Sequence, residues 1–141
     1  MGRSRSTLFL MEQIIVITIF AICAAVCVKI LVVSFLMTVD AVDTKNALLA
    51  VESAAESHKA FAGDNSSIAR ILGGHYNDYG VIVYFNCDWQ SIDIAEDASF
   101  VLHLYRYREE PALILSDIFV TRVASGDQLV SITTAVRTVE S

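Results

Sequence analysis

The side chains that could do chemistry in this 141-residue chain are spread widely along it. The three histidines, His58, His75 and His103, stand apart, and none has a second histidine or a cysteine at metal-ligand spacing. Acids beside His75 and within residues 93–97 supply oxygen atoms, but without the regular ligand spacing of a calcium loop. The sequence also lacks the motifs of phosphate-binding loops, serine hydrolases and cysteine-histidine catalysis. We therefore expect no metal, no cofactor and no enzyme activity.

One acidic side chain has an unusual setting. Glu12 lies four residues into an apolar run, Leu8–Val39, whose only other charge is Lys29. A carboxylate is costly next to lipid, so an acid in such a run is a candidate for function. The simpler interpretation is an interfacial glutamate stabilised by the positive end of a helix. Glu12 must therefore be interpreted together with its surroundings.

The run Leu8–Val39 is 32 residues long and contains no Pro, Gly, Asn or Asp. A helix that spans a bilayer needs about 20 mostly apolar residues, so this run can cross a membrane with a third of its length to spare. A span that starts with the run leaves Ile30–Val39 as a bare apolar helix outside, and a later span places Lys29 in hydrocarbon. Either arrangement suits a helix that packs against other helices. Ala21 and Ala25 form a small-xxx-small pair that permits such packing.

Charge predicts the orientation of the chain in a membrane. Arg3 and Arg5 precede the apolar run, and Asp40 and Asp43 follow it, which places the N-terminus in the cytoplasm and the C-terminal domain outside. Residues 40–141 hold seven basic and fifteen acidic side chains, a net charge of −8. An acidic domain repels phosphate backbones, so we expect no nucleic-acid partner.

A short basic leader, then LFLMEQIIV, then a long apolar helix resembles the N-terminal segment of type IV pilins and pseudopilins. The resemblance is closest to small pseudopilin-like proteins of Gram-positive bacteria. In that family a small residue, normally glycine, precedes the cleavage point, and the mature chain carries Glu at its fifth position. Counting back from Glu12 places the first mature residue at Leu8 and the cleavage after Thr7, where this chain has threonine in place of glycine.

The resemblance implies a structural subunit of a type IV pilus-like or type II secretion-like (pseudopilus) assembly. It implies three kinds of partner: a prepilin peptidase, an assembly ATPase with its membrane platform, and other pilin-like subunits. It also implies a role for Glu12, because cleavage would free an α-amine on Leu8 with which the Glu12 carboxylate of a neighbouring subunit can pair. Pairing removes most of the penalty of two isolated charges in an apolar core.

A second hypothesis is a chain that is never cleaved. It would remain a signal-anchored membrane protein whose outer domain is a binding module. Thr7 at the cleavage point favours this hypothesis. Glu12 and the surplus apolar length of Ile30–Val39 favour the assembly subunit.

Beyond residue 39 the helix is expected to continue to Phe61 as an amphipathic segment that ends at Gly63. The apolar stripe expected to face a sheet consists of Ala41, Leu48, Val51, Ala55, His58 and Ala62. The opposite, polar side is expected to include Asp43. A short helix, Ile68–Leu72, capped by Asn65 or Ser66 and stopped by Gly73-Gly74, should follow.

Four strands are expected after this helix: Val81–Asn86, Ser99–Arg108, Ala112–Val123 and Leu129–Val139. Short connections between them favour an antiparallel meander. The predicted fold class is α+β, with a long N-terminal helix, membrane-spanning in its first half, packed on a sheet of about four strands. The expected parts are a basic leader (1–7), an assembly helix (8–39), its amphipathic continuation (40–62) and an extracytoplasmic domain (63–141). Cys87 is the only cysteine in that domain, expected as a buried apolar side chain or, alternatively, as a pairing site for a partner.

Overall fold

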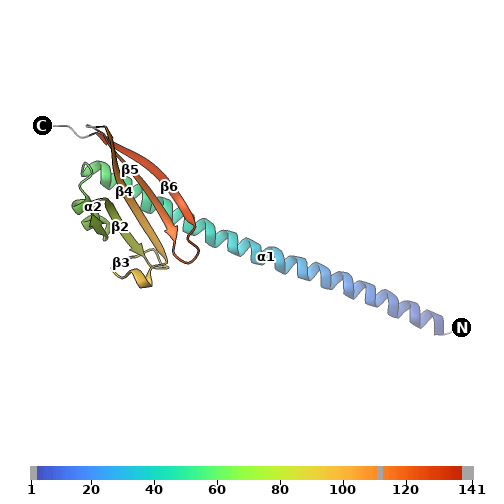
Figure 1. Ribbon diagram of the computed structural model, residues 1–141. Coiled ribbons are helices and arrows are strands. Elements are labelled where there is room, and N and C mark those ends of the chain that lie inside the picture. The colour runs from blue at the N-terminus through green and yellow to red at the C-terminus, as the bar shows by residue number, and fades with distance from the viewer. Residues whose placement is uncertain (1–2, 111–112, 138–141) are drawn as a thin grey trace. The chain divides into compact units, whose positions relative to one another are not determined.

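The computed structural model describes residues 3–110 and 113–137 (Figure 1). The chain divides into two compact units, an N-terminal unit of residues 1–41 and a C-terminal domain of residues 42–141. The fold class is α+β, as the sequence predicts. The expected strand limits Ala112 and Val139 lie outside the described residues.

The first element is a single long helix, α1, Arg3–Ala60. It forms because no Gly or Pro interrupts the chain between its first residue and Gly63, and its N-terminal part supplies all the described residues of the N-terminal unit. Within the described residues, α1 from Ser6 onward is the one helix long and apolar enough to cross a membrane. This confirms the predicted long helix and its capacity to span a bilayer.

The C-terminal domain contains one six-stranded antiparallel sheet. Its strands are β1 (His75–Asn77), β2 (Gly80–Phe85), β3 (Ser91–Ile92), β4 (Phe100–Glu110), β5 (Leu113–Arg122) and β6 (Gln128–Arg137). The order is β1-β2-β4-β5-β6, and β3 also pairs with β2. The sequence predicted about four strands and did not predict β1 and β3. These two strands are three and two residues long and therefore too short to show an alternating pattern.

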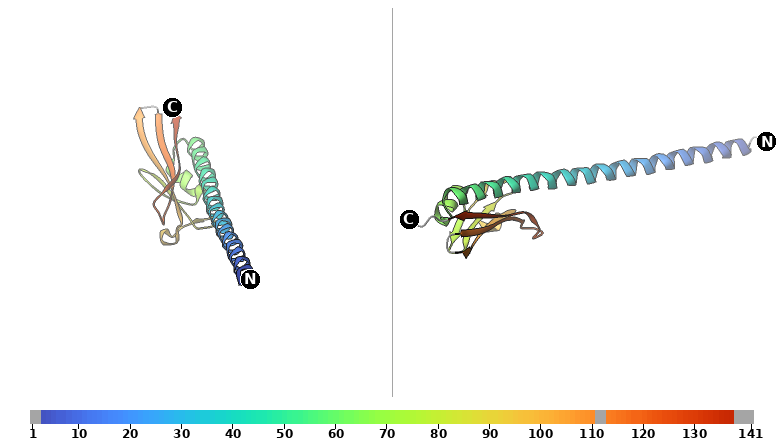
Figure 2. Two further views of the ribbon diagram at one scale, coloured as in Figure 1. Left: turned by 90° about the vertical axis from the view of Figure 1, so that its right-hand side faces the viewer. Right: turned by 90° about the horizontal axis from the view of Figure 1, so that it is seen from above.

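One face of the sheet is covered by the last part of α1 and by a short helix, α2 (Asn65–Leu72), as Figures 1 and 2 show. Side chains from these helices and from β2, β4 and β5 form the core of the domain. Its fully buried members include Val51, Ile68, Val83, Leu102, Leu104, Ile118 and Val120. We call this covered side the inner face.

The stripe of α1 that packs on the sheet differs from the predicted one. Its buried members are Ala47, Val51, Ala54, Ala55, Ser57 and His58. The prediction was right for Val51, Ala55 and His58 but wrong for Ala41, Leu48 and Ala62, which are exposed. It followed a strict seven-residue repeat, whereas an α-helix has 3.6 residues per turn and drifts about 20° per heptad away from such a repeat.

Helix α2 has a different N-cap from the one predicted. Asp64 caps it by accepting a hydrogen bond from the Ser67 backbone N–H at 3.2 Å, and hydrogen bonds from Ser67 and Ser66 hold the pKa of Asp64 below its usual value. Asn65 instead points its side-chain amide at the Asn77 carbonyl oxygen, 3.0 Å away on β1. At the other end the predicted stop is confirmed, since Gly73 adopts a left-handed conformation with φ 69°.

Candidate functional site

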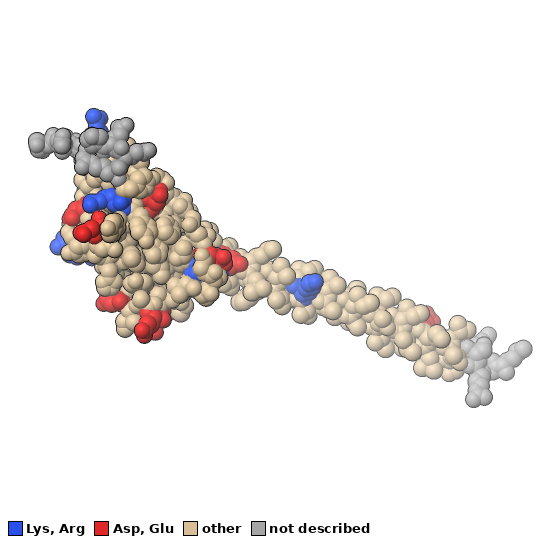
Figure 3. All heavy atoms as spheres, in the orientation of Figure 1, with Lys and Arg blue, Asp and Glu red and all other residues tan. Residues whose placement is uncertain are grey.

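The apolar segment Leu8–Val39 is the most distinctive surface of the chain. All of its side chains are exposed, and Phe9, Phe20, Leu31 and Phe35 are each at least two-thirds exposed. Figure 3 shows this part of the helix almost entirely tan, interrupted where charged side chains lie. Soluble monomers rarely expose apolar patches larger than a few hundred Å², so this surface requires lipid or other protein around it.

The threonines and the charged side chains of the apolar segment differ in whether the helix provides them with a partner. The hydroxyls of Thr18 and Thr38 donate to the carbonyl oxygens of Ile14 and Ser34, at 2.7 and 2.9 Å, so they are satisfied within the helix. Glu12 and Lys29 differ, because no ion pair or hydrogen bond of either side chain occurs within residues 3–110 and 113–137. Glu12 and Lys29 are the two charged side chains of the segment, and the segment itself provides no partner for either.

The other predicted assembly residues also lie on α1. Thr7 and Leu8, which flank the expected cleavage point, are helical and exposed. Ala21 and Ala25 are exposed on roughly the opposite side of the helix from Glu12, given about 100° per residue. The chain therefore presents the carboxylate and the small-residue pair on different faces, and their roles remain predictions.

In the C-terminal domain, Asp43 holds the start of the packed part of α1 against the sheet. Its carboxylate accepts a hydrogen bond from Arg122 of β5 at 2.8 Å, in an ion pair, and one from the indole N–H of Trp89 at 3.4 Å. Trp89 also stacks on Phe100, with 4.2 Å between ring centroids. The expectation that Asp43 belongs to the polar side was therefore wrong.

The loop after β2 brings Trp89 into this contact. The side-chain oxygen of Asn86 accepts hydrogen bonds from the backbone N–H groups of Asp88 and Gln90, both at 3.0 Å. Trp89 between them has a left-handed φ of 60°. That strained backbone is maintained by the tight loop and by the stacking of the indole. Sequence reasoning missed this arrangement, although Asp43 lies one helical turn before Ala47 and shares its face.

His58 is fully buried between α1 and the sheet. Its Nε2 atom lies 2.8 Å from the Ser116 hydroxyl, while its Nδ1 atom has no hydrogen-bond partner. Nearby, the Arg106 guanidinium donates to the Gly63 carbonyl oxygen at 2.8 Å. Burial lowers the pKa of His58 below its usual value, and the positive charge of Arg106 lowers it further. The expectation that His58 faces the sheet is confirmed.

Acidification from about pH 7.5 to about pH 5 is expected to destabilise the domain. An unfolded chain binds a proton at His58 near the ordinary pKa of 6.5, whereas the folded domain binds it only at lower pH. The unfolded state therefore holds more protons, so the stabilisation is complete above pH 6.5 and is lost as the pH falls through the folded pKa. The free energy of unfolding changes by at most about 1.4 kcal/mol per pH unit for each histidine of this kind. Thermal unfolding at several pH values, followed by fluorescence of Trp89, the one tryptophan, measures this pH dependence.

His58→Gln provides the matched control for this pH dependence. Glutamine keeps a polar group toward Ser116 but cannot titrate, so the slope should become smaller. Burial also lowers the pKa of His103, which adds to the slope with the same sign. An unchanged slope in the double variant His58→Gln/His103→Gln would contradict the assignment.

The outer face of the sheet, opposite the helices, carries a row of rings. His103 stacks on Phe119 of the neighbouring strand with 5.0 Å between centroids and on Tyr105 of its own strand with 5.9 Å. Tyr105 and Tyr107 are 47% and 43% exposed. We call the set His103, Tyr105 and Phe119 the ring cluster. The ring planes of the cluster lie within 24° of parallel to one another, and Tyr105 is its exposed member, whereas His103 and Phe119 are partly buried.

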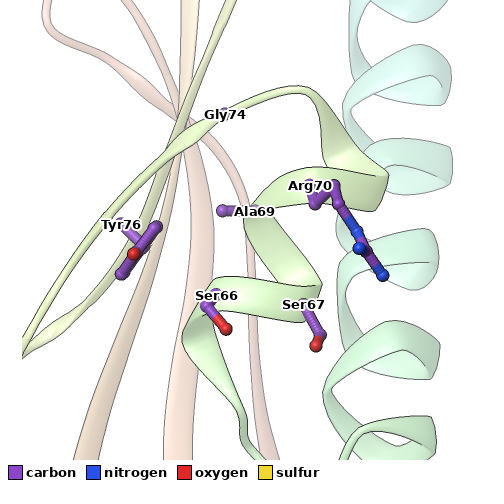
Figure 4. A pocket seen from close by; sticks show the side chains of 6 residues that line it. All are labelled: Ser66, Ser67, Ala69, Arg70, Gly74 and Tyr76. Carbon is purple, nitrogen blue, oxygen red and sulfur yellow. The ribbon is translucent and has the colours of Figure 1, made fainter.

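A shallow pocket lies between α2 and the segment after it (Figure 4). It has a volume of 390 Å³ and is lined by Ser66, Ser67, Ala69, Arg70, Gly74 and Tyr76. The labelled side chains do not converge, because Arg70 extends from α2 on the side away from Tyr76, which lies on β1. Tyr76 is 62% exposed. The pocket therefore offers surface groups without an arrangement that indicates catalysis.

Among the described residues, no three His, Cys, Asp or Glu side chains gather closely enough to hold a metal ion. His75 is exposed, with Nε2 3.3 Å from the Asp93 carbonyl oxygen. Cys23, Cys27 and Cys87 are free thiols and exposed. Cys87 is thus not the buried apolar side chain that was expected, because the loop after β2 turns it toward solvent.

Comparison with known proteins gives no relative for the chain. No protein-family model, no curated protein and no solved structure matches it. The function must therefore be argued from the residues and surfaces described above.

Proposed function

We propose that the chain is a structural subunit of a type IV pilus-like or type II secretion-like (pseudopilus) assembly, inserted and packed through its N-terminal helix. The observation that carries the proposal is the apolar segment, which is helical and exposed throughout its 32 residues. At 1.5 Å per residue it is about 48 Å long, against a hydrocarbon core of about 30 Å. A lone anchor has no need of the additional 18 Å or so, whereas a helix packed among identical helices buries all of it.

Glu12 is the residue we assign to assembly. It is exposed on an apolar surface without a partner in the described chain, and its position matches the fifth residue of a mature pilin-like chain that begins at Leu8. The expected partners are other pilin-like subunits, a prepilin peptidase and an assembly ATPase with its platform. The N-terminus lies in the cytoplasm and the acidic domain outside, under the positive-inside rule.

The intact mass of the protein from its native membrane tests this function. We expect loss of Met1–Thr7, with or without a methyl group on Leu8, because the assembly proposal places a mature N-terminus there. The variant Thr7→Gly restores the residue that is normal in the family and should be processed at least as completely. A full-length mass for both chains, apart from removal of Met1, would contradict pilin-type processing.

The second candidate is an uncleaved, signal-anchored protein whose outer domain is a binding module. Two observations favour it: the threonine at the expected cleavage point and the ring cluster on the outer face of the sheet. Under this hypothesis the full-length chain persists, and substitutions in the ring cluster abolish partner binding without affecting membrane insertion. Neither candidate assigns an enzymatic step to the chain.

A further inference from the structure

The two charges of the apolar segment define a spacing along α1. Glu12 and Lys29 are seventeen positions apart, which corresponds to about 25 Å along the axis and about 100° around it. Both side chains are exposed, and neither has an ion-pair or hydrogen-bond partner among the described residues. Each is an isolated charge on an apolar surface, a costly arrangement that pairing with the opposite charge relieves.

Copies of the chain at equal depth in a bilayer cannot form this pair. They insert in the same orientation, so Glu12 of one copy lies level with Glu12 of its neighbour, and Lys29 lies level with Lys29. Like charges then face each other, while opposite charges remain about 25 Å apart. The opposite charges meet only when one copy is displaced along the helix axis.

We propose that Glu12 of one copy pairs with Lys29 of the next in an assembly whose neighbouring copies are displaced axially by about 25 Å. The inference rests on the proposed function and specifies the contact that sets the register. The copy that contributes Glu12 is displaced outward relative to the copy that contributes Lys29. Fifteen residues of the two apolar segments still overlap, about 22 Å of helix, so the displaced pair keeps a substantial apolar contact.

This contact has a consequence for symmetry. The surface around Glu12 and the surface around Lys29 are different patches on different sides of the helix, so each copy uses one patch toward one neighbour and the other toward the next. Such a head-to-tail contact makes a ring only if it lacks a translation along the axis. With a displacement of about 25 Å it cannot close, and copies add to an open helical fibre.

A second cation could compete for Glu12. Cleavage after Thr7 would free an α-amine on Leu8, four residues from Glu12 and therefore about 6 Å away along the axis. Pairing with that amine requires a displacement of about 6 Å, and pairing with Lys29 requires about 25 Å. The two contacts therefore predict different neighbours along the helix, which cross-linking can distinguish.

Charge exchange in the full-length chain is the first test. Glu12→Lys and Lys29→Glu are each expected to reduce the yield of sheared filaments at least about tenfold, since each variant places like charges together. The double variant should recover most of the wild-type yield. Filaments that form normally with Lys29→Glu, or a double variant that stays defective although both single variants insert in the membrane, would overturn the pairing and leave the proposed function standing. A wild-type chain that forms no multimers would overturn both.

Cysteine cross-linking tests the register without altering either charge. Val16 and Val33 lie one helical turn after Glu12 and Lys29, on the same two faces, and both are exposed. In a background with Cys23→Ala, Cys27→Ala and Cys87→Ser, chains carrying Val16→Cys are co-expressed with chains carrying Val33→Cys, and the membranes are oxidised. We expect mainly disulfides between positions 16 and 33. Mainly 16–16 and 33–33 disulfides would show copies at equal depth and overturn the inference.

Discussion

Replacing Gly80 with alanine is expected to destabilise the domain by about 3 kcal/mol or more. Gly80 begins β2 and lies opposite Tyr105 of β4. A Cβ atom at this position would lie 1.7 Å from the Leu104 carbonyl oxygen and 2.9 Å from the Leu104 carbonyl carbon. These are backbone atoms of a central strand, so the clash cannot be relieved by a side-chain rotation. Either β2 and β4 separate at this end, or the hairpin formed by β1 and β2 distorts.

Gly126→Ala is the matched control for this prediction. Gly126 has a φ of 72°, but a methyl group on its Cα would meet no atom within 4 Å, so the cost is limited to left-handed strain of about 1–2 kcal/mol. Both variants are compared with the wild type by urea unfolding of the full chain in detergent micelles, with Trp89 fluorescence as the signal. Equal destabilisation by the two alanines would show that β2 and β4 are not as close at Gly80 as described.

Much of this fold could be predicted because it is encoded locally. An uninterrupted apolar run predicts a helix, and the alternation of Phe100, Leu102 and Leu104 predicts a strand with one buried face. The two charges of the proposed assembly contact could also be found, since Glu12 and Lys29 stand out in their own segment. These features depend on residues that are close together in the sequence. Sequence periodicity carries information only over such short separations.

The long-range contacts of the C-terminal domain could not be predicted in this way. Asp43 meets Trp89 and Arg122 across 46 and 79 residues, so this contact depends on strand order and register. The same holds for the ring cluster, where Phe119 joins His103 because β4 and β5 pair in the register that places them opposite each other. The alternation of apolar and polar residues along a strand assigns each side chain to one face of the sheet. It does not show which residues of the next strand lie beside that side chain.

The stripe on α1 is one place where the sequence pattern and the structure disagree, and a matched pair of leucine variants tests which is right. Leu104→Ala removes a side chain that is 1% exposed and whose strand neighbours are Val81 and Ile118. The surrounding sheet can collapse little into the resulting cavity, so we expect a loss of about 3 kcal/mol, within the roughly 2–5 kcal/mol typical of buried leucines.

Leu48→Ala makes the same chemical change at a position that the seven-residue repeat assigns to the sheet. Leu48 is 41% exposed, so its removal exposes little core and should cost less than about 1 kcal/mol. Urea unfolding of both variants, monitored by Trp89 fluorescence, compares the two losses directly. If Leu48→Ala cost as much as Leu104→Ala, the helix would pack through the heptad stripe. A loss at least twofold smaller would support packing through Ala47, Val51 and Ala54, the face to which Asp43 also belongs.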